Sequence, residues 1–222
     1  MRRLLMRRLL LSFGLLVVTL CARQAEATLI DRGNGLIYDT VLNITWTQNA
    51  NLCVTLGNCI PGPGGFMSFA NANTWAANLV FGGFSDWRLA NISSTSPTTT
   101  PTDCSTATAA ACAASGNELG YMFYQNLNGT FGDSKVGNQV GNGGVTFNNI
   151  QVGYWSGTEG NAVLAWSFLF FDGNQGNVFK VNSNAAWAVR PGDSVGVPEP
   201  GSLVLLGLGL LGLRVGQWWR GR

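Results

Sequence analysis

The sequence predicts a mixed α+β domain with two helices and a mainly antiparallel sheet, flanked by segments for export and membrane insertion. Three observations support this class. Apolar residues alternate with polar ones early in the chain and again in its last third, which is typical of half-buried strands. Two stretches between them place apolar residues at helical spacing. Apolar runs with neighbouring arginines occupy both ends of the 222-residue chain.

The first segment has the layout of a secretory signal peptide. Four arginines precede an apolar run at residues 9–20, and Ala25-Glu26-Ala27 places small residues where a signal peptidase reads. The run is short for a membrane span, which needs about 20 residues. We therefore predict that residues 1–27 are a signal peptide and that the exported domain begins at Thr28. An uncleaved membrane helix is the alternative.

The body opens with a strand pattern. Leu36 and Tyr38, then Leu42, Ile44 and Trp46, alternate with polar residues. This period of two predicts two strands around a turn.

Helical spacing marks two segments farther along. Apolar residues recur every three or four positions from Phe69 to Leu79, and Gly82-Gly83 ends that helix. The same spacing predicts a second helix from Leu119 to Leu127. Between the two helices, residues 93–115 are rich in Ser, Thr and Ala and lack apolar periodicity. They predict a loop.

The last third predicts further strands, at 145–152, 163–171, 178–181 and 186–190, separated by glycine and asparagine. One connection, Asp172-Gly173-Asn174-Gln175-Gly176-Asn177, begins like an EF-hand calcium loop. Ser183 stands where that loop needs a glutamate, and hairpin turns also favour Asp-Gly. We expect a turn here and no metal site.

The C-terminal segment combines three parts in a fixed order. Pro198, Glu199 and Pro200 precede an apolar run at 203–213 rich in leucine and glycine, and arginines follow it. A glycine-rich apolar helix is better tolerated in lipid than in water, and the basic end places the tail in the cytoplasm. We predict a transmembrane helix in residues 194–222.

These three parts resemble the PEP-CTERM sorting signal. The resemblance implies that Pro198, Glu199 and Pro200 are read by exosortase, a membrane protease of Gram-negative bacteria that make exopolysaccharide. It also implies export to the outer envelope or cell surface, with at least transient anchoring in the membrane. An ordinary C-terminal anchor is the alternative.

Charge and cysteine content describe the exported body. Eight of the thirteen Lys and Arg residues lie in the signal or the tail, so residues 28–193 keep five cations against nine acids, a net charge of about −4. This balance argues against nucleic acid as a partner. The body holds an even number of cysteines, which suits disulfides in an oxidising compartment. Three pairings are possible, and proximity favours Cys53 with Cys59 and Cys104 with Cys112.

Five short motifs follow one another along the body. They are Gly35-Leu36-Ile37-Tyr38-Asp39 with Thr45-Trp46, Asp86-Trp87-Arg88-Leu89, Tyr154-Trp155-Ser156-Gly157-Thr158-Glu159, Ala165-Trp166-Ser167-Phe168 and Ala188-Val189-Arg190-Pro191. Together these motifs resemble the Lcl C-terminal-like domain, a family catalogued as a domain of unknown function. The resemblance implies a C-type-lectin-like fold for residues 28–193, of a kind found in exported bacterial adhesins and other surface proteins.

The motif residues are interpreted as structural. The body's large indole rings are expected in the core, although one or two exposed tryptophans stacking on sugar rings is the alternative. Arg88 and Arg190 lie beside apolar residues and are expected to form ion pairs. The tryptophans are Trp46, Trp75, Trp87, Trp155, Trp166 and Trp187, and the candidate carboxylate partners are Asp86, Glu118, Glu159 and Asp193.

Catalysis is not expected. The chain has no histidine, and no Ser or Cys stands in a recognisable nucleophile motif. Without histidine, a zinc site is not expected either, and no cofactor is implied. A hydrolase using a carboxylate such as Glu159 or Asp172 is the enzymatic alternative.

The expected function is that of a surface-retained binding or adhesin-like module associated with envelope glycan or exopolysaccharide. The alternative is a structural or protein-interaction component of the cell surface that binds no glycan.

Overall fold

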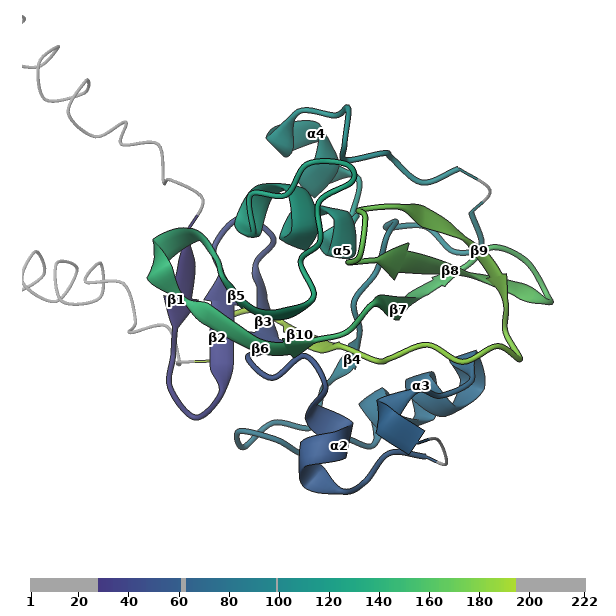
Figure 1. The fold of residues 1–222 in the computed structure, drawn as a ribbon. Helices are drawn as coiled ribbons and strands as arrows, with labels where there is room; N and C mark the ends of the chain where they lie inside the picture. Colours follow the sequence, from purple (N-terminus) through teal and green to yellow (C-terminus); the bar gives the residue numbers. More distant parts are fainter. Residues whose placement is uncertain (1–27, 61–62, 99, 195–222) are drawn as a thin grey trace, which may run out of the picture.

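The computed structural model describes residues 28–60, 63–98 and 100–194 (Figure 1). The predicted signal peptide at 1–27 and the predicted transmembrane helix of the tail lie outside these residues. Within the described ranges, no helix has the length and apolar character that a membrane crossing requires.

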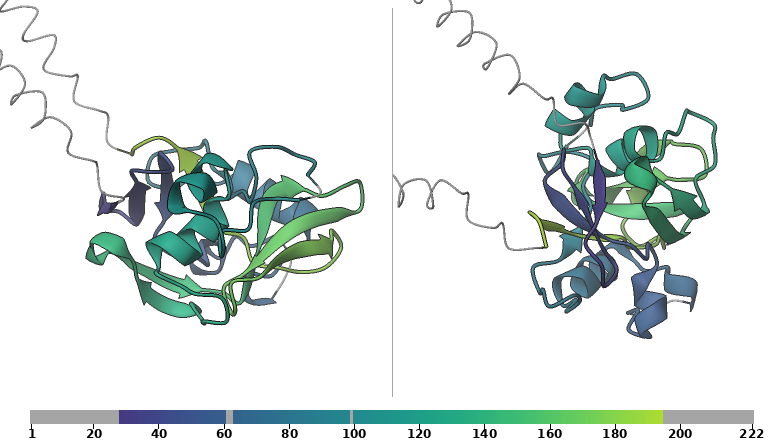
Figure 2. Two further views of the ribbon diagram at one scale, coloured as in Figure 1. Left: turned by 90° about the horizontal axis from the view of Figure 1, so that it is seen from above. Right: turned by 90° about the vertical axis from the view of Figure 1, so that its left-hand side faces the viewer.

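A five-stranded antiparallel sheet joins the beginning and the end of the body. Its order is β1-β2-β3-β10-β4, so the last strand inserts between the third and fourth. Both ends of the body therefore lie on the same side of the molecule (Figures 1 and 2). The strands are β1 (Leu29–Asp31), β2 (Leu36–Asp39), β3 (Ile44–Thr47), β4 (Arg88–Leu89) and β10 (Ala188–Pro191).

Strands β2 and β3 confirm the first predicted hairpin. Ile37 lies opposite Trp46 and packs into one hydrophobic core, whereas Leu36 packs into the core on the other face of the sheet. At the turn, one carboxylate oxygen of Asp39 accepts hydrogen bonds from the backbone N–H groups of Val41 and Leu42, each at 3.0 Å. The sheet is thus covered on both faces, which is why β3 has no exposed residue.

Two smaller sheets complete the antiparallel part of the fold. A two-stranded sheet pairs β5 with β6, and a three-stranded sheet has the order β7-β8-β9. Strands β6, β8 and β10 confirm three of the four strands predicted in the last third, and β9 begins at Gln175, three residues before the predicted strand at 178–181. The predicted antiparallel character is confirmed, although the strands are divided among three sheets. Strand β7 was missed because nearly all its residues are buried and show no alternation. The bounds are β5 Gly137–Val140, β6 Thr146–Ile150, β7 Gly153–Glu159, β8 Leu164–Leu169 and β9 Gln175–Phe179.

Both predicted helices are present. Helix α3 (Phe69–Ala77) starts at Ser68, whose side chain accepts from the N–H of Asn71, and ends before Gly82-Gly83 at Asn78. Helix α5 (Glu118–Tyr121) continues as a π-helical turn, η2 (Met122–Asn126).

The prediction of only two helices was wrong, because the described part of the chain has four α-helices. Helix α2 (Leu52–Leu56) and helix α4 (Ala109–Ala114) are too short for apolar periodicity to appear. Helix α4 lies inside the segment predicted as a loop. Its alanine run and its N-cap Thr108, which accepts from the N–H of Ala111, are the signals that mark it. Short 3-10 turns, η1 and η3, cover Pro63–Gly65 and Asn142–Gly144.

Two hydrophobic cores lie on the two faces of the central sheet. Helices α2 and α3 cover one face, and α5 lies on the other (Figure 1). The core under α3 includes Phe69, Trp75, Trp87 and Trp155, and the core under α5 includes Trp46, Phe123, Phe147, Phe168 and Trp187. The last sheet, β7-β8-β9, is held in place because its side chains pack into both cores.

Candidate functional site

The tryptophans of the body are all buried. Trp166 is the most exposed of the six, with 8% of its surface accessible. Its indole N–H donates to the carbonyl of Thr98 at 2.8 Å, and that of Trp187 donates to Thr47 at 2.8 Å. The indole nitrogen of Trp46 has no hydrogen-bond partner among the described residues; its ring meets that of Trp187 edge-on at 4.9 Å. The alternative in which exposed tryptophans stack on sugars is therefore wrong for these residues.

The motif arginines lie in bidentate ion pairs that join separate elements. Arg88 of β4 donates to both oxygens of Glu118 at the start of α5, at 2.6 and 2.7 Å. Arg190 of β10 donates to both oxygens of Asp86, at 2.8 and 3.1 Å, and its guanidinium lies 3.8 Å from the ring centre of Phe84. The N–H donors of Arg190 lower the pKa of Asp86.

The other two candidate carboxylates pair with different cations. Glu159 lies 3.3 Å from the ammonium of Lys180, and Asp193 lies 2.5 Å from the guanidinium of Arg32. The pair between Arg32 and Asp193 ties the β1–β2 turn to the segment just after β10. All four carboxylates therefore hold elements of the fold together.

Two disulfides close short loops. Cys53 in α2 is bonded to Cys59, with Cα atoms 4.7 Å apart, and Cys104 is bonded to Cys112 in α4, with Cα atoms 5.2 Å apart. These are the two pairs that sequence proximity favours. The second disulfide fixes the end of a loop that forms one wall of a cleft.

The cleft has a volume of about 240 Å³ and lies between three segments that are far apart in the sequence. The disulfide loop forms one wall, the β8–β9 hairpin forms the other, and Phe131 from the segment before β5 stands at the edge. The ring of Phe131 is 65% exposed. The lining residues are Thr100, Pro101, Asp103, Phe131, Trp166, Gly173, Asn174 and Gln175.

A buried amide holds the two walls together. The side-chain nitrogen of Asn117 donates to the carbonyl of Thr102 at 2.7 Å and to the side-chain oxygen of Gln175 at 2.9 Å. Gln175 in turn donates to Thr102 at 3.3 Å, and the side-chain oxygen of Asn117 caps α5 at the N–H of Gly120. Hydrogen bonds from Asn117 and Gln175, to each other and to the backbone of Thr102, therefore hold the two walls of the cleft together.

The base of the hairpin wall packs on Tyr124. Its hydroxyl donates to the carbonyl of Gly173 at 2.7 Å. Gly173 has a positive φ of 81°, and a Cβ atom there would meet the tyrosine hydroxyl oxygen at 2.5 Å. Burial, followed by the nearby negative charge of Asp103, raises the pKa of Tyr124 to about 12, and Asp172 contributes in the same direction. Two carboxylates therefore lie close to this end of the cleft.

The segment that begins at Asp172 forms a hairpin turn between β8 and β9, as predicted, but the turn is shorter than expected because β9 begins at Gln175. Leu169 donates its backbone N–H to Asn174, and the carboxylate of Asp172 accepts from the N–H of Asn174 at 2.9 Å. Among the described residues, no three His, Cys, Asp or Glu side chains converge as ligands for a metal ion.

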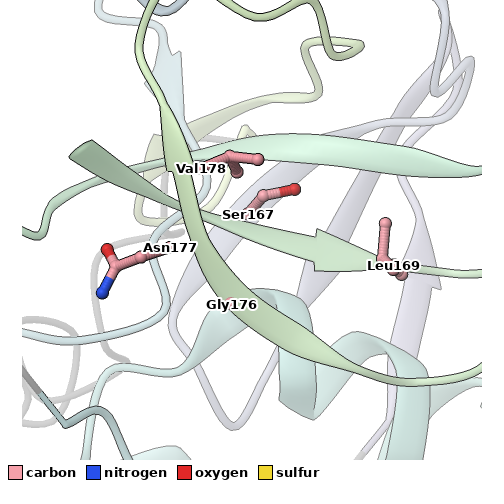
Figure 3. Close-up of a pocket in the computed structure, with 5 residues that line it drawn as sticks. All are labelled: Ser167, Leu169, Gly176, Asn177 and Val178. Atoms are coloured by element: carbon pink, nitrogen blue, oxygen red, sulfur yellow. The ribbon is translucent and has the colours of Figure 1, made fainter. Parts of the chain in front are cut away.

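A second, smaller hollow lies on the opposite face of the same hairpin. It has a volume of about 120 Å³ and is mostly apolar. Figure 3 shows Ser167, Leu169 and Val178 on one side of the two strands, with Gly176 adding no side chain and Asn177 pointing away. A Cβ atom at Gly176 would meet no atom within 4 Å. This hollow offers little hydrogen-bonding capacity, which makes it the weaker candidate.

The residues of the cleft were not predicted as a site. The sequence marks residues 93–115 as a disulfide-tied loop and Asp172 to Asn177 as a turn, but nothing in it shows that the two segments meet. Phe131 carries no local signal, since a single phenylalanine between glycines resembles any surface aromatic residue. The sequence features that mark the two walls separately are the cysteine pair in the loop and the Asp-Gly turn in the hairpin.

Comparisons with known proteins agree with the two resemblances. The model of the Lcl C-terminal domain matches residues 35–190, and that of the PEP-CTERM protein-sorting motif matches residues 196–218. A search of curated proteins found no match. The sorting motif implies an exosortase-dependent protein that is exported to the cell surface or membrane of a Gram-negative bacterium. Because its match spans well over half of the sequence, the first model identifies the chain as a member of the Lcl C-terminal domain family.

Proposed function

We propose that the chain is a non-catalytic binding module, retained at the bacterial surface, whose cleft holds a unit of envelope glycan or exopolysaccharide. The observation that carries this proposal is the cleft between the disulfide loop and the β8–β9 hairpin, in which hydrogen-bonding groups stand beside the exposed ring of Phe131. The sorting motif supports the proposal, because it implies export to the cell surface, where envelope polysaccharide is within reach.

The chemistry of the cleft suits a sugar. Asp103, Asn174 and Gln175 supply carboxylate and amide groups, which bind hydroxyls as donors and acceptors. The ring of Phe131 offers an apolar surface for the C–H face of a pyranose. The volume of about 240 Å³ is below the roughly 300–1,000 Å³ of pockets for drug-sized ligands, so we expect one unit of a chain to be held.

Export and anchoring complete the proposal. Residues 1–27 act as a cleaved signal peptide, and the apolar helix in residues 194–222 spans the membrane until exosortase acts at Pro198, Glu199 and Pro200. The body takes a C-type-lectin-like fold. This agrees with the motif resemblance and with a central sheet in which the last strand, β10, pairs with β3. The ion pair between Arg32 and Asp193 holds the two ends together next to the tail.

A structural or protein-interaction component is the second candidate. Three side chains on or next to the β8–β9 hairpin support it, because Phe171, Phe179 and Val181 are each more than half exposed. Apolar groups of this size on a surface are typical of contacts with another protein. All six tryptophans are buried, which agrees with this candidate as well.

The test is retention of the full-length chain, in detergent, on exopolysaccharide immobilised from a bacterium that makes the protein. We expect Phe131→Ala to reduce retention about tenfold, by removing a ring worth roughly 1–1.5 kcal/mol of stacking and apolar contact. The matched control is Phe179→Ala, which removes an equally exposed ring outside the cleft lining. Equal loss in both variants would favour the protein-interaction candidate, and release of reducing ends by the wild type would show a hydrolase.

A further inference from the structure

We propose that the cleft is selective for charge, taking neutral or amine-bearing sugar units and rejecting units that carry carboxylate or phosphate. This inference rests on the proposed function and names the ligand class of the same site. It comes from two carboxylates, Asp103 and Asp172, whose charge no cation in the described part of the chain neutralises.

The two carboxylates have the same local geometry, one on each wall. One oxygen of Asp103 accepts from the N–H of Ser105 at 2.9 Å, and one oxygen of Asp172 accepts from the N–H of Asn174 at 2.9 Å. The second oxygen of each makes no hydrogen bond among the described residues. Asp103 lines the cleft, and Asp172 immediately precedes the lining residue Gly173. Asp103 can therefore accept from a ligand hydroxyl or ammonium, and the charge of Asp172 lies next to the cleft lining.

The charges of Asp103 and Asp172 both act on the hydroxyl of Tyr124, which is partly buried. The hydroxyl of Tyr124 lies against Gly173, and after burial, the charge of Asp103 is the largest cause of its raised pKa, with Asp172 a smaller one. An anion placed in the cleft would meet the same two charges. Because the walls exclude part of the solvent, this repulsion is screened less than it would be on an open surface.

The cations of the body are engaged elsewhere. Four of the five form the ion pairs described above. The fifth cation, Lys135, lies near Asp133. The pKa of Asp133 is lowered by hydrogen bonds from Thr130 and, to a smaller extent, by the charge of Lys135. Lys135 therefore has Asp133 as a neighbouring carboxylate, and it forms no ion pair with Asp103 or Asp172 among the described residues.

The experiment compares three sets of oligosaccharides of equal length: glucosamine oligomers, their N-acetylated counterparts and glucuronate oligomers. The first two differ only in the amine. Binding of each to the full-length chain in detergent is measured at low and at high salt. We expect the amine-bearing oligomer to bind about tenfold more tightly than the uronate, with the neutral oligomer between them. High salt should reduce the difference.

The variants locate the source of the selectivity. Asp103→Asn keeps the oxygen that accepts from Ser105, so the turn is preserved, and we expect the preference to fall to about threefold. With Asp172→Asn added, the preference should vanish. Asp31→Asn is the matched control. Asp31, at the end of β1, accepts from the N–H of Gly33 in the same kind of turn, and neither residue lines the cleft. It should retain the full preference.

Two results overturn the inference in different ways. Equal binding of the uronate and neutral oligomers, or an unchanged preference in the double variant, contradicts charge selection and leaves the proposed function intact. Failure of the wild type to bind any of the three oligomers, or the exopolysaccharide itself, contradicts both.

Discussion

In the part of the chain that the structure describes, charged side chains are paired at the β4–β10 edge of the central sheet and unpaired at the cleft. At the sheet edge, Arg88 pairs with Glu118 and Arg190 pairs with Asp86 through two hydrogen bonds each. At the cleft, Asp103 and Asp172 take part in no ion pair among the described residues. Bidentate pairs between distant segments fix the fold, whereas a carboxylate held only by its own turn keeps an oxygen for a ligand. The comparison predicts that charges at the edge control stability and charges at the cleft control binding.

The largest effect on stability is expected from Glu118→Gln. Glu118 is buried and also accepts from the N–H of Asn91 at 2.8 Å, so the variant leaves the Arg88 guanidinium without its counter-charge. Because the Arg88 side chain is 38% exposed, the pair is only partly buried, and we expect the variant to cost about 2.5 kcal/mol, less than the roughly 3–5 kcal/mol of a fully buried pair. Urea unfolding measures it. The control is Glu159→Gln, whose exposed pair with Lys180 should contribute less than about 1 kcal/mol. Equal losses would show that burial does not distinguish the pairs.

Removing each disulfide separates stability from cleft geometry. Replacing Cys104 and Cys112 by serine, or Cys53 and Cys59 by serine, should each cost about 2 to 2.5 kcal/mol, because the closed loops are of similar length. Only the first pair holds a cleft wall, so only that variant should also lose polysaccharide retention. Loss of retention in both variants, measured under conditions where both are folded, would contradict this assignment.

A smaller, pH-dependent effect is expected from Asp86→Asn. Arg190 lowers the pKa of Asp86 below its usual 3.8, so the pair stabilises the fold above that value and loses its effect as the pH falls through the lowered pKa. The carboxylate is 47% exposed, so the loss should stay below about 1 kcal/mol. Thermal unfolding of the wild type and the variant should differ at neutral pH and converge at about pH 2. A difference that persists in acid would show another cause.

The smallest effect on stability is expected from Asp172→Asn. The asparagine keeps an oxygen for the N–H of Asn174 and breaks no ion pair, so the free energy of unfolding should change by less than about 0.5 kcal/mol. Its effect should appear in the preference between charged oligosaccharides. A stability loss as large as that of Glu118→Gln would contradict the prediction that charges at the cleft control binding and not stability.

Most of the core elements could be predicted from the sequence, and the site could not. The hairpin of β2 and β3, helix α3 and the helix from Glu118 follow from apolar spacing in the sequence, and the last strands follow from apolar runs separated by glycine and asparagine. Helices α2 and α4 are single turns fixed by disulfides, and β7 is buried on both faces, so neither kind of element leaves a periodic pattern.

The cleft illustrates the limit in physical terms. Its walls are joined by Asn117, which contacts Thr102 and Gln175 at sequence separations of 15 and 58 residues. No local pattern encodes a contact made by one buried amide across two loops. The tryptophans, which the sequence makes prominent, form the core, and the exposed ring at the cleft is a phenylalanine.

The emission of Trp166 tests whether the cleft holds a sugar, because Trp166 lines the cleft from the edge of the core, whereas the other five tryptophans of the body lie in the cores and outside the cleft lining. The full-length chain would be titrated with oligosaccharides released from the exopolysaccharide of the producing bacterium. We expect a saturable change in emission that Trp166→Phe abolishes, that Phe131→Ala weakens, and that Gly176→Val, which fills the opposite hollow, leaves unchanged. A signal that survives Trp166→Phe, or binding that only Gly176→Val removes, would contradict the assignment of the cleft as the binding site.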